Sequence, residues 1–209
     1  MTGRKQVPSP SLFFLQQFIA RPRMVGSVIP TSRTAVRALL DPIAWDGVRC
    51  VVEYGPGTGV FTRELLRRLG PDARLIAIDT NPIFIDYLRR AIPDPRLACV
   101  EGSAADVAAI LRSHGFEQAD HVISGLPFST LPSAVAHAIM DATAHALRPG
   151  GAFLIYQYSR FVLPFLRDRF RRIDQGKVWR CIPPARLFWA HKGGPVSRAA
   201  VADENLVGA

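Results

Sequence analysis

The sequence predicts one α/β domain built around a seven-stranded, mostly parallel sheet that ends in an antiparallel hairpin. Three observations lead to this fold class. Short β-branched runs alternate with helical patterns from residue 48 to residue 158, as in βαβ units. Two further strand-like runs follow, separated only by Pro183-Pro184, which favours an antiparallel pair. The 209 residues, 48% of them hydrophobic, are enough to bury one core without disulfides or a metal.

The elements of this domain can be placed one by one along the chain. Apolar positions of residues 131–147 recur at helical spacing, residues 161–170 also have a helical pattern, and Arg148-Pro149-Gly150-Gly151 is a tight turn into a strand. Right-handed crossovers between the parallel strands then favour a doubly wound sheet. The predicted strands are Val48 to Tyr54, Arg74 to Asp79, Leu97 to Glu101, His121 to Gly125, Gly151 to Tyr158, Lys177 to Ile182 and Ala185 to His191.

The predicted domain spans residues 41–192 and is flanked by two segments of different character. Residues 193–209 have no periodicity and are predicted to be disordered. Within residues 1–40, Ser11 can cap an amphipathic helix from Leu12 to Ala20. Such a helix can lie on a membrane surface or can pack over the sheet or the cofactor, and the sequence supports both interpretations.

Positive charge is concentrated in two segments of a chain whose formal net charge is +9. Residues 1–40 contain six basic residues and no acid, and residues 160–180 contain seven basic residues and two acids. This distribution favours an anionic partner, either a membrane or a nucleic acid. No apolar run approaches the roughly 20 residues of a spanning helix, and three scattered cysteines indicate a reducing cytosol.

A glycine-rich loop, Glu53-Tyr54-Gly55-Pro56-Gly57-Thr58-Gly59, directly follows the first strand and opens a helix. Asp79 ends the second strand about 20 residues further on, where an acid can bind ribose hydroxyls. Together they predict a Rossmann-like nucleotide site. Glu53 stands where the dinucleotide pattern has its first glycine, and its carboxylate would repel a pyrophosphate. The same carboxylate suits the cationic methionine end of S-adenosylmethionine, the predicted cofactor, which leaves as S-adenosylhomocysteine.

The third strand ends in Glu101-Gly102-Ser103-Ala104, a suitable edge for an adenine ring. No metal site is predicted. The predicted cofactor-binding residues are Glu53, Gly55, Gly57, Gly59, Asp79, Thr80, Gly102, Ser103, Ala104 and Gly125.

Ser124-Gly125-Leu126-Pro127-Phe128 ends the fourth strand and should line the crevice beside the transferring methyl group. Enzymes that methylate exocyclic adenine amines resemble this motif but have an Asn where this chain has Gly125. The Asn accepts a hydrogen bond from the amine, whereas Gly125 offers only its backbone carbonyl. Recognition of a planar base amine is therefore weakened.

The chain resembles the small soluble-type bacterial phospholipid N-methyltransferases, which belong to the class I S-adenosylmethionine-dependent methyltransferases. The resemblance runs from about Phe13 to Lys192 and departs from the family at Ser103, where an acid is common. It implies methylation of phosphatidylethanolamine and its mono- and dimethyl derivatives towards phosphatidylcholine, and membrane association through Leu12 to Ala20. Its carriers are Phe13-Phe14-Leu15, Gly26-Ser27-Val28-Ile29-Pro30-Thr31-Ser32, the Glu53 to Gly59 loop, Gly125-Leu126-Pro127-Phe128 and Tyr156-Gln157-Tyr158-Ser159.

Aromatic faces can host the quaternary ammonium that forms as methyl groups accumulate, and arginines can hold a lipid phosphate. The residues predicted to act in catalysis are Tyr158, Phe128 and Gly125. Those predicted to bind the substrate are Arg23, Ser32, Tyr54, Tyr156, Arg160 and Trp179.

Two alternatives to the lipid enzyme remain open at this point. One is an rRNA adenine N6-dimethyltransferase, which Gly125 and the lack of a helical RNA-binding domain after residue 192 disfavour. The other is a non-catalytic membrane- or nucleic-acid-binding protein on the same fold. The main interpretation predicts a monomeric cytoplasmic enzyme, peripheral on the inner face of the bacterial membrane, whose partners are anionic lipids rather than nucleic acid.

Overall fold

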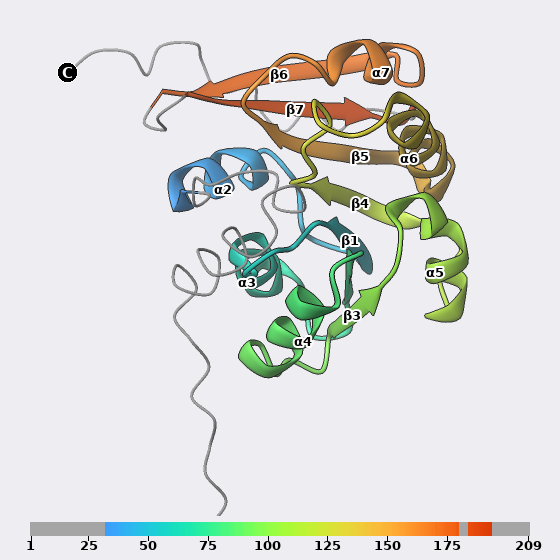
Figure 1. Cartoon of the computed structure of the whole chain (residues 1–209). Coiled ribbons are helices and arrows are strands. Elements are labelled where there is room, and N and C mark those ends of the chain that lie inside the picture. Colours follow the sequence, from blue (N-terminus) through green and yellow to red (C-terminus); the bar gives the residue numbers. More distant parts are fainter. Residues whose placement is uncertain (1–31, 180–183, 194–209) are drawn as a thin grey trace, which may run out of the picture.

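A single seven-stranded sheet with helices on both faces forms the body of the molecule in the computed structural model, which describes residues 32–179 and 184–193 (Figure 1). The strand order is β3-β2-β1-β4-β5-β7-β6, and β7 runs in the direction opposite to that of the other six strands. The predicted fold class is confirmed. The strands are β1 (Cys50–Tyr54), β2 (Arg74–Asp79), β3 (Leu97–Glu101), β4 (Ala119–Ser124), β5 (Leu147–Gln157), β6 (Arg172–Val178) and β7 (Ala185–His191).

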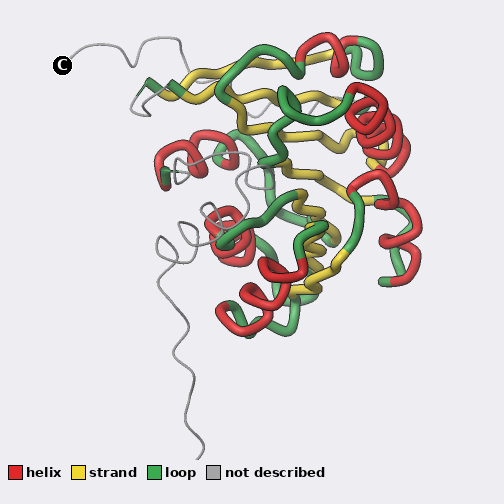
Figure 2. The backbone as a smooth tube through the Cα atoms, in the orientation of Figure 1, coloured by secondary structure: helices red, strands yellow, loops and turns green. Residues whose placement is uncertain are grey.

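Helices cover the sheet in two layers, which the tube view separates clearly from the strands (Figure 2). One buried cluster joins the sheet to α2 and α3, and a second joins its other face to α5, α6 and α7. Both faces of the central strands are therefore covered, so every residue of β1 and β4 is buried. The helices are α2 (Arg33–Leu40), α3 (Val60–Arg68), α4 (Pro82–Ala91), the short 3-10 helix η1 (Ala104–Asp106), α5 (Val107–Ser113), α6 (Ser133–Ala146) and α7 (Leu163–Arg167).

The helix α2 belongs to the packed domain, so the domain begins before residue 41. Ser32 caps it by accepting a hydrogen bond from the Ala35 amide at 3.1 Å, and its buried face includes Val36 and Leu39. The Trp189 indole of β7 donates to the Leu39 carbonyl at 2.8 Å and ties the helix to the antiparallel end of the sheet. The predicted helix Leu12 to Ala20, Arg23, and the tail from residue 194 lie outside the described residues.

The largest departure from the predicted elements is β6, which runs from Arg172 to Val178 and not from Lys177 to Ile182. It is an edge strand with polar and charged residues at most positions, so it lacks the apolar run by which the other strands were recognised. The predicted helix 161–170 shortens to α7. The β5 strand begins at Leu147, because Ala119 pairs with Leu147 and a register shift follows before His121 pairs with Ala152.

Asp120 locks the amino ends of the central strands together. Its Oδ2 accepts hydrogen bonds from the backbone amides of Arg49 and Cys50, both at 2.8 Å, and Oδ1 pairs with Arg148. Burial raises the pKa of this carboxyl, but the hydrogen bonds from Cys50, Arg49 and Arg148 outweigh that effect and lower it. The ionised form is thus the one that the fold stabilises.

We expect Asp120→Asn to lower the free energy of unfolding by about 2 kcal/mol, because charge-assisted hydrogen bonds of this kind contribute roughly 1.5–3 kcal/mol. Urea denaturation at neutral pH measures this loss. Since the folded pKa is lowered, the contribution of Asp120 is present above its unfolded pKa and disappears as the pH falls through the folded value. The difference between wild type and variant should therefore shrink in acid. The exposed Asp72→Asn variant is the control, and an equal loss in it would contradict the assignment.

Candidate active site

The loop between β1 and α3 is shaped by three glycines in the left-handed region. Gly55, Gly57 and Gly59 have φ values of 64°, 54° and 78°, which other residues rarely adopt. A Cβ on Gly59 would lie 2.6 Å from Ile92 Cδ1, so this glycine also permits the close approach of α3 to the end of α4. The loop can therefore turn sharply and present bare backbone to a ligand.

Backbone hydrogen bonds join this loop to the ends of the neighbouring strands. The Gly55 amide donates to the Ile78 carbonyl of β2 at 3.0 Å. The Gly102 amide after β3 donates to the Asp79 carbonyl at 3.0 Å, and the Gly125 amide after β4 donates to the Tyr54 carbonyl at 3.1 Å. The predicted cofactor residues consequently gather at the carboxyl edge of β1, β2, β3 and β4, where the strand order reverses and ligands bind in doubly wound sheets.

Glu53, at the end of β1, carries a buried carboxylate. The residue is 2% exposed, and its Oε2 accepts a hydrogen bond from the Thr62 hydroxyl of α3 at 2.7 Å. Burial raises the pKa of Glu53 to about 7, although the Thr62 hydrogen bonds oppose the shift. Asp79 raises this pKa further by repulsion and Arg63 lowers it. A cationic ligand would stabilise the ionised form, which makes Glu53 a receptor for positive charge.

Asp79 and Asn81 form the polar end of β2. Burial raises the pKa of Asp79 to about 6, against the effect of hydrogen bonds from the backbone amides of Asn81, Gly57 and Thr80. Asn81 caps α4 by accepting from the Ile83 amide at 3.0 Å. Its buried Nδ2 has no partner among the described residues, so a donor is left for a ligand at this point. Asn81 was not predicted as a site residue, although an Asn before Pro82 is a recognisable helix start.

Comparison with known proteins decides the identity of this site. Residues 51–151 match a family model described as a methyltransferase domain. Over 182 residues, 84% of this chain and 93% of the relative, the sequence is 33% identical to an ornithine lipid N-methyltransferase of Singulisphaera acidiphila. The chain belongs to the class I S-adenosylmethionine-dependent methyltransferases.

Two other similarities support less, one because it covers a shorter segment and the other because its sequence identity is low. The methyltransferase is 33% identical over 85 residues to a ribosomal RNA small subunit methyltransferase H of Flavobacterium johnsoniae, but the match spans 41% of this chain and 26% of that relative. The structure of the N-methyltransferase NodS of Bradyrhizobium japonicum, in complex with S-adenosylhomocysteine, superposes with a TM-score of 0.67 at 14% identity. It covers 90% of this chain and all of NodS, and it shows the shared fold.

The described residues of this methyltransferase fit S-adenosylmethionine. The glycine backbone leaves room for the ligand, Glu53 offers a carboxylate to its cationic methionine end, and Asp79 offers acceptors to ribose hydroxyls. Asn81 Nδ2 supplies the donor that lacks a partner. The Ser103 hydroxyl accepts the capping hydrogen bond of η1 and keeps its own hydrogen to donate, whereas the buried Ala104 has only backbone groups to offer an adenine ring.

On the acceptor side, the loop after β4 is held by its neighbours. Gly125 is exposed, and a Cβ on Gly55 would lie 3.0 Å from Leu126 Cδ2, so the two loops pack closely. The side-chain amide of Gln157, buried at the end of β5, donates to the Leu126 carbonyl. The sequence places Gln157 only within the Tyr156 to Ser159 motif and assigns it no site role, because its partner lies 31 residues away. It keeps the Gly125 loop in place beside the cofactor residues.

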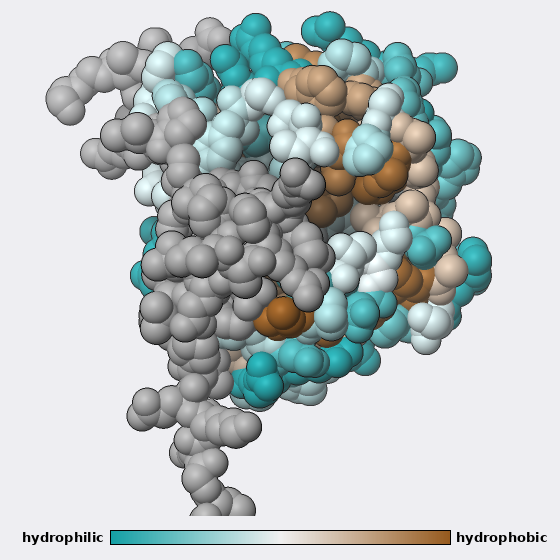
Figure 3. Space-filling view, in the orientation of Figure 1, coloured by the Kyte–Doolittle hydropathy of each residue, from teal (hydrophilic) through white to brown (hydrophobic). Residues whose placement is uncertain are grey.

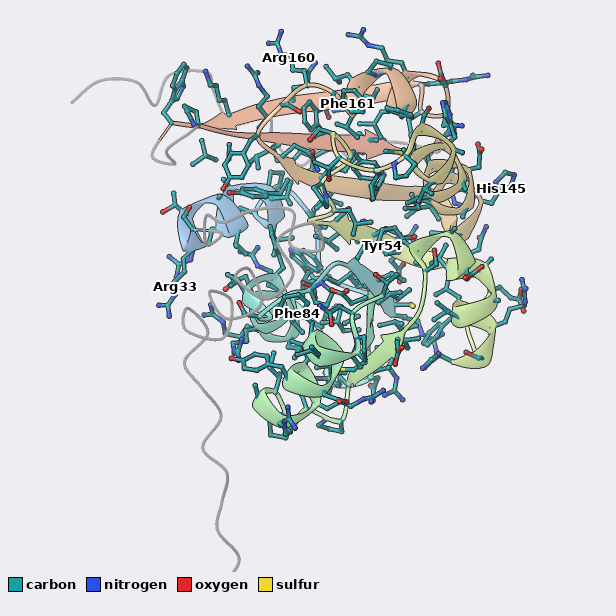
Figure 4. The ribbon with its side chains drawn as sticks, in the orientation of Figure 1. Arg33, Tyr54, Phe84, His145, Arg160 and Phe161 are labelled. Atoms are coloured by element: carbon teal, nitrogen blue, oxygen red, sulfur yellow. The ribbon has the colours of Figure 1, made fainter. Side chains whose placement is uncertain are left out.

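Tyr54 and Phe128 correct the sequence-based assignments. Both side chains are fully buried in the cluster beneath α6 and α7, and the Tyr54 hydroxyl lies 3.1 Å from Thr143 Oγ1 (Figure 4). The cause is the alternation of side chains along β1, which places Glu53 on one face and Tyr54 on the other. The Tyr54 ring therefore points away from Glu53 into this cluster, and the Phe128 ring is enclosed in the same cluster and does not line a crevice.

The remaining predicted acceptor residues lie apart from one another. Tyr156 and Tyr158 share the face covered by α2 and α3, where their hydroxyls are 2.8 Å apart and Tyr156 packs edge-on against Phe61. Tyr158 is half-buried and remains a candidate for the acceptor site. Trp179 and Arg160 lie farther along the same edge of the sheet and are exposed. The five predicted aromatic residues therefore do not form one cage.

The affinity for S-adenosylmethionine should increase as the pH rises from 5.5 to 7.5. A Glu53 with a pKa of about 7 is largely protonated at the lower limit, and ionisation creates the charge that the cationic ligand needs. Isothermal titration calorimetry across this range measures the trend. In Glu53→Gln, we expect affinity at pH 7.5 to fall about tenfold or more, as for loss of a charge-assisted hydrogen bond. A pH dependence as steep as that of the wild type would contradict the role of Glu53. Thr62→Ser, which keeps the hydroxyl, is the control.

Proposed function

We propose that this methyltransferase transfers methyl groups to the amine of a membrane lipid. The observation that carries the proposal is the similarity to the ornithine lipid N-methyltransferase, which extends over 182 residues and thus well beyond the 51–151 segment of the general methyltransferase model. The resemblance to phospholipid N-methyltransferases favours phosphatidylethanolamine and its mono- and dimethyl derivatives as acceptors. Ornithine lipid is the acceptor that the relative's name suggests.

For methyl transfer, the protein mainly has to position the acceptor nitrogen relative to the cofactor. Bound S-adenosylmethionine supplies an electrophilic methyl group on its sulfonium, and the acceptor nitrogen must meet it in line with its lone pair free. The chain's contribution is to hold that nitrogen beside the cofactor edge. The exposed Gly125, fixed by Gln157 through Leu126, presents its backbone carbonyl to an amine hydrogen. Tyr158 offers a half-buried ring to the methylated ammonium.

The proposal places the enzyme on a membrane surface without a spanning helix. None of the helices in residues 32–179 and 184–193 is long and apolar enough to cross a bilayer. Contact with the inner face of the bacterial membrane is assigned to the basic N-terminal segment and to Leu12 to Ala20, which the sequence alone supports. Anionic lipids are the partners that this charge favours.

Radiolabelled methyl transfer tests the proposed function. Wild-type protein is given labelled S-adenosylmethionine with phosphatidylethanolamine vesicles, ornithine lipid vesicles or undermethylated ribosomal RNA. We expect label in at least one lipid and none in RNA. Label in RNA alone would refute the lipid enzyme, and a reaction without protein provides the background for all three acceptors.

Replacing Phe14 and Phe18 by Glu should lower binding to anionic vesicles while S-adenosylmethionine affinity stays unchanged. Phe18 belongs to the apolar face of the predicted amphipathic helix and Phe14 lies beside it, four residues earlier, and charge there opposes burial among acyl chains. Vesicle sedimentation measures the effect. Replacement of Gln16 and Gln17 by Glu adds the same charge at positions outside the predicted apolar face, and an equal loss there would contradict the prediction.

A further inference from the structure

A row of polar side chains extends from the acceptor loop across the antiparallel half of the sheet. Gln157 of β5 pairs in register with Arg186 of β7, and Arg186 pairs with Lys177 of β6. Residues paired in this way project from the same face of a sheet, and neighbouring strands lie about 4.8 Å apart. Since Gln157 holds the Leu126 carbonyl, Arg186 and Lys177 stand one and two strand spacings from the group that fixes the acceptor loop.

Arg160 joins these two cations around a hollow of about 220 Å³. The hollow is also lined by Gln175, Gly176 and Phe188. Within residues 32–179 and 184–193, none of the three cations makes an ion pair, and the lining includes no acid. Desolvation and then the positive charges of Arg186 and Arg160 lower the pKa of the Lys177 ammonium. Like charges that line one hollow repel one another, and a bound anion would relieve that repulsion.

Exposed aromatic side chains flank the same hollow. Trp179 is 69% exposed, and the Lys177 ammonium lies 3.2 Å from the centre of its ring. Phe161, next to Arg160, is 50% exposed, and the side-chain view places the two at the β6 side of the molecule (Figure 4). Apolar surface gathers nearby over α6 and α7, bordered by hydrophilic residues (Figure 3). Aromatic rings combined with cations are typical of surfaces that meet a bilayer interface.

We propose that Arg160, Lys177 and Arg186 bind the oxyanion of the acceptor lipid's headgroup. The proposal rests on the proposed lipid methylation and names the part of the substrate that this second site recognises. Phosphatidylethanolamine and ornithine lipid differ in their headgroups, but the phosphodiester of one and the carboxylate of the other are both oxyanions a few bonds from the reactive amine. With the oxyanion held by β6 and β7, the amine extends along the sheet edge towards Gly125.

The test uses the full chain with Lys177 and Arg186 both replaced by Gln. Acceptor lipid is presented in non-ionic detergent micelles, which removes general attraction to a charged surface, with phosphatidylethanolamine in one arm and ornithine lipid in the other. For the lipid that the wild type methylates, we expect KM about tenfold higher, kcat within twofold and unchanged affinity for S-adenosylhomocysteine. Arg90 and Arg112, exposed on α4 and α5, are replaced by Gln as the charge-matched control and should leave both constants unchanged.

The outcomes separate the site from the function on which it rests. If the wild type is active and the double variant has the same KM, the oxyanion site is overturned but lipid methylation is still supported. A fall in kcat without a rise in KM would show a structural effect and would also overturn it. A rise in KM for only one of the two lipids identifies whether the oxyanion is the phosphodiester or the carboxylate. If the wild type methylates neither lipid, both proposals fail. Arg160→Gln, in the loop after β5, repeats the test should the double variant fold poorly.

Discussion

The position of β1 at the centre of the sheet constrains everything at the site. β1 is paired in parallel with β2 on one side and β4 on the other, so Tyr54 stands level with both Ile78 and Ser124. The loops that follow these three strands therefore leave the sheet side by side at its carboxyl edge. The glycine loop, Asp79 and Gly125 meet there for that reason, and Asp120 fixes the opposite ends of the same strands.

A buried carboxylate at this edge leaves the ligand-free protein with an unfavourable group. The pKa of Glu53 is raised, which means that the folded state holds the proton more tightly than the unfolded state does. Its ionisation therefore opposes folding as the pH rises from the unfolded pKa to about 7. Asp79, with a pKa of about 6, adds to the same tendency. A cation beside Glu53 and hydroxyl donors to Asp79 would offset these penalties, so cofactor binding and stability are coupled by the same residues.

The sequence predicted those parts of the structure that depend on local pattern. The parallel strands were recognisable as apolar runs, and the glycine loop with Glu53 and Asp79 by its spacing. The edge strand β6 was misplaced because it has little apolar surface to bury. The roles of Thr62 and Gln157 could not be predicted from the sequence, since they depend on partners that the fold supplies. Asn81 was recognisable as a helix start, but the sequence does not show that its Nδ2 is buried without a partner among the described residues. For Tyr54, strand alternation alone would have indicated that it faces away from Glu53.

The antiparallel hairpin explains how recognition of the acceptor can be separate from the chemistry. Because β7 runs against β5, it begins at the edge where β5 ends, and β6 ends there too. Side chains far along the sequence from the glycine loop thus reach the catalytic edge. In the proposed lipid methylation, each further methyl group would replace a hydrogen on the acceptor nitrogen, so contacts made to those hydrogens would weaken at each step. The headgroup oxyanion does not change. A cationic site on the hairpin would hold each methylated intermediate equally well, as an enzyme that methylates the same amine repeatedly requires.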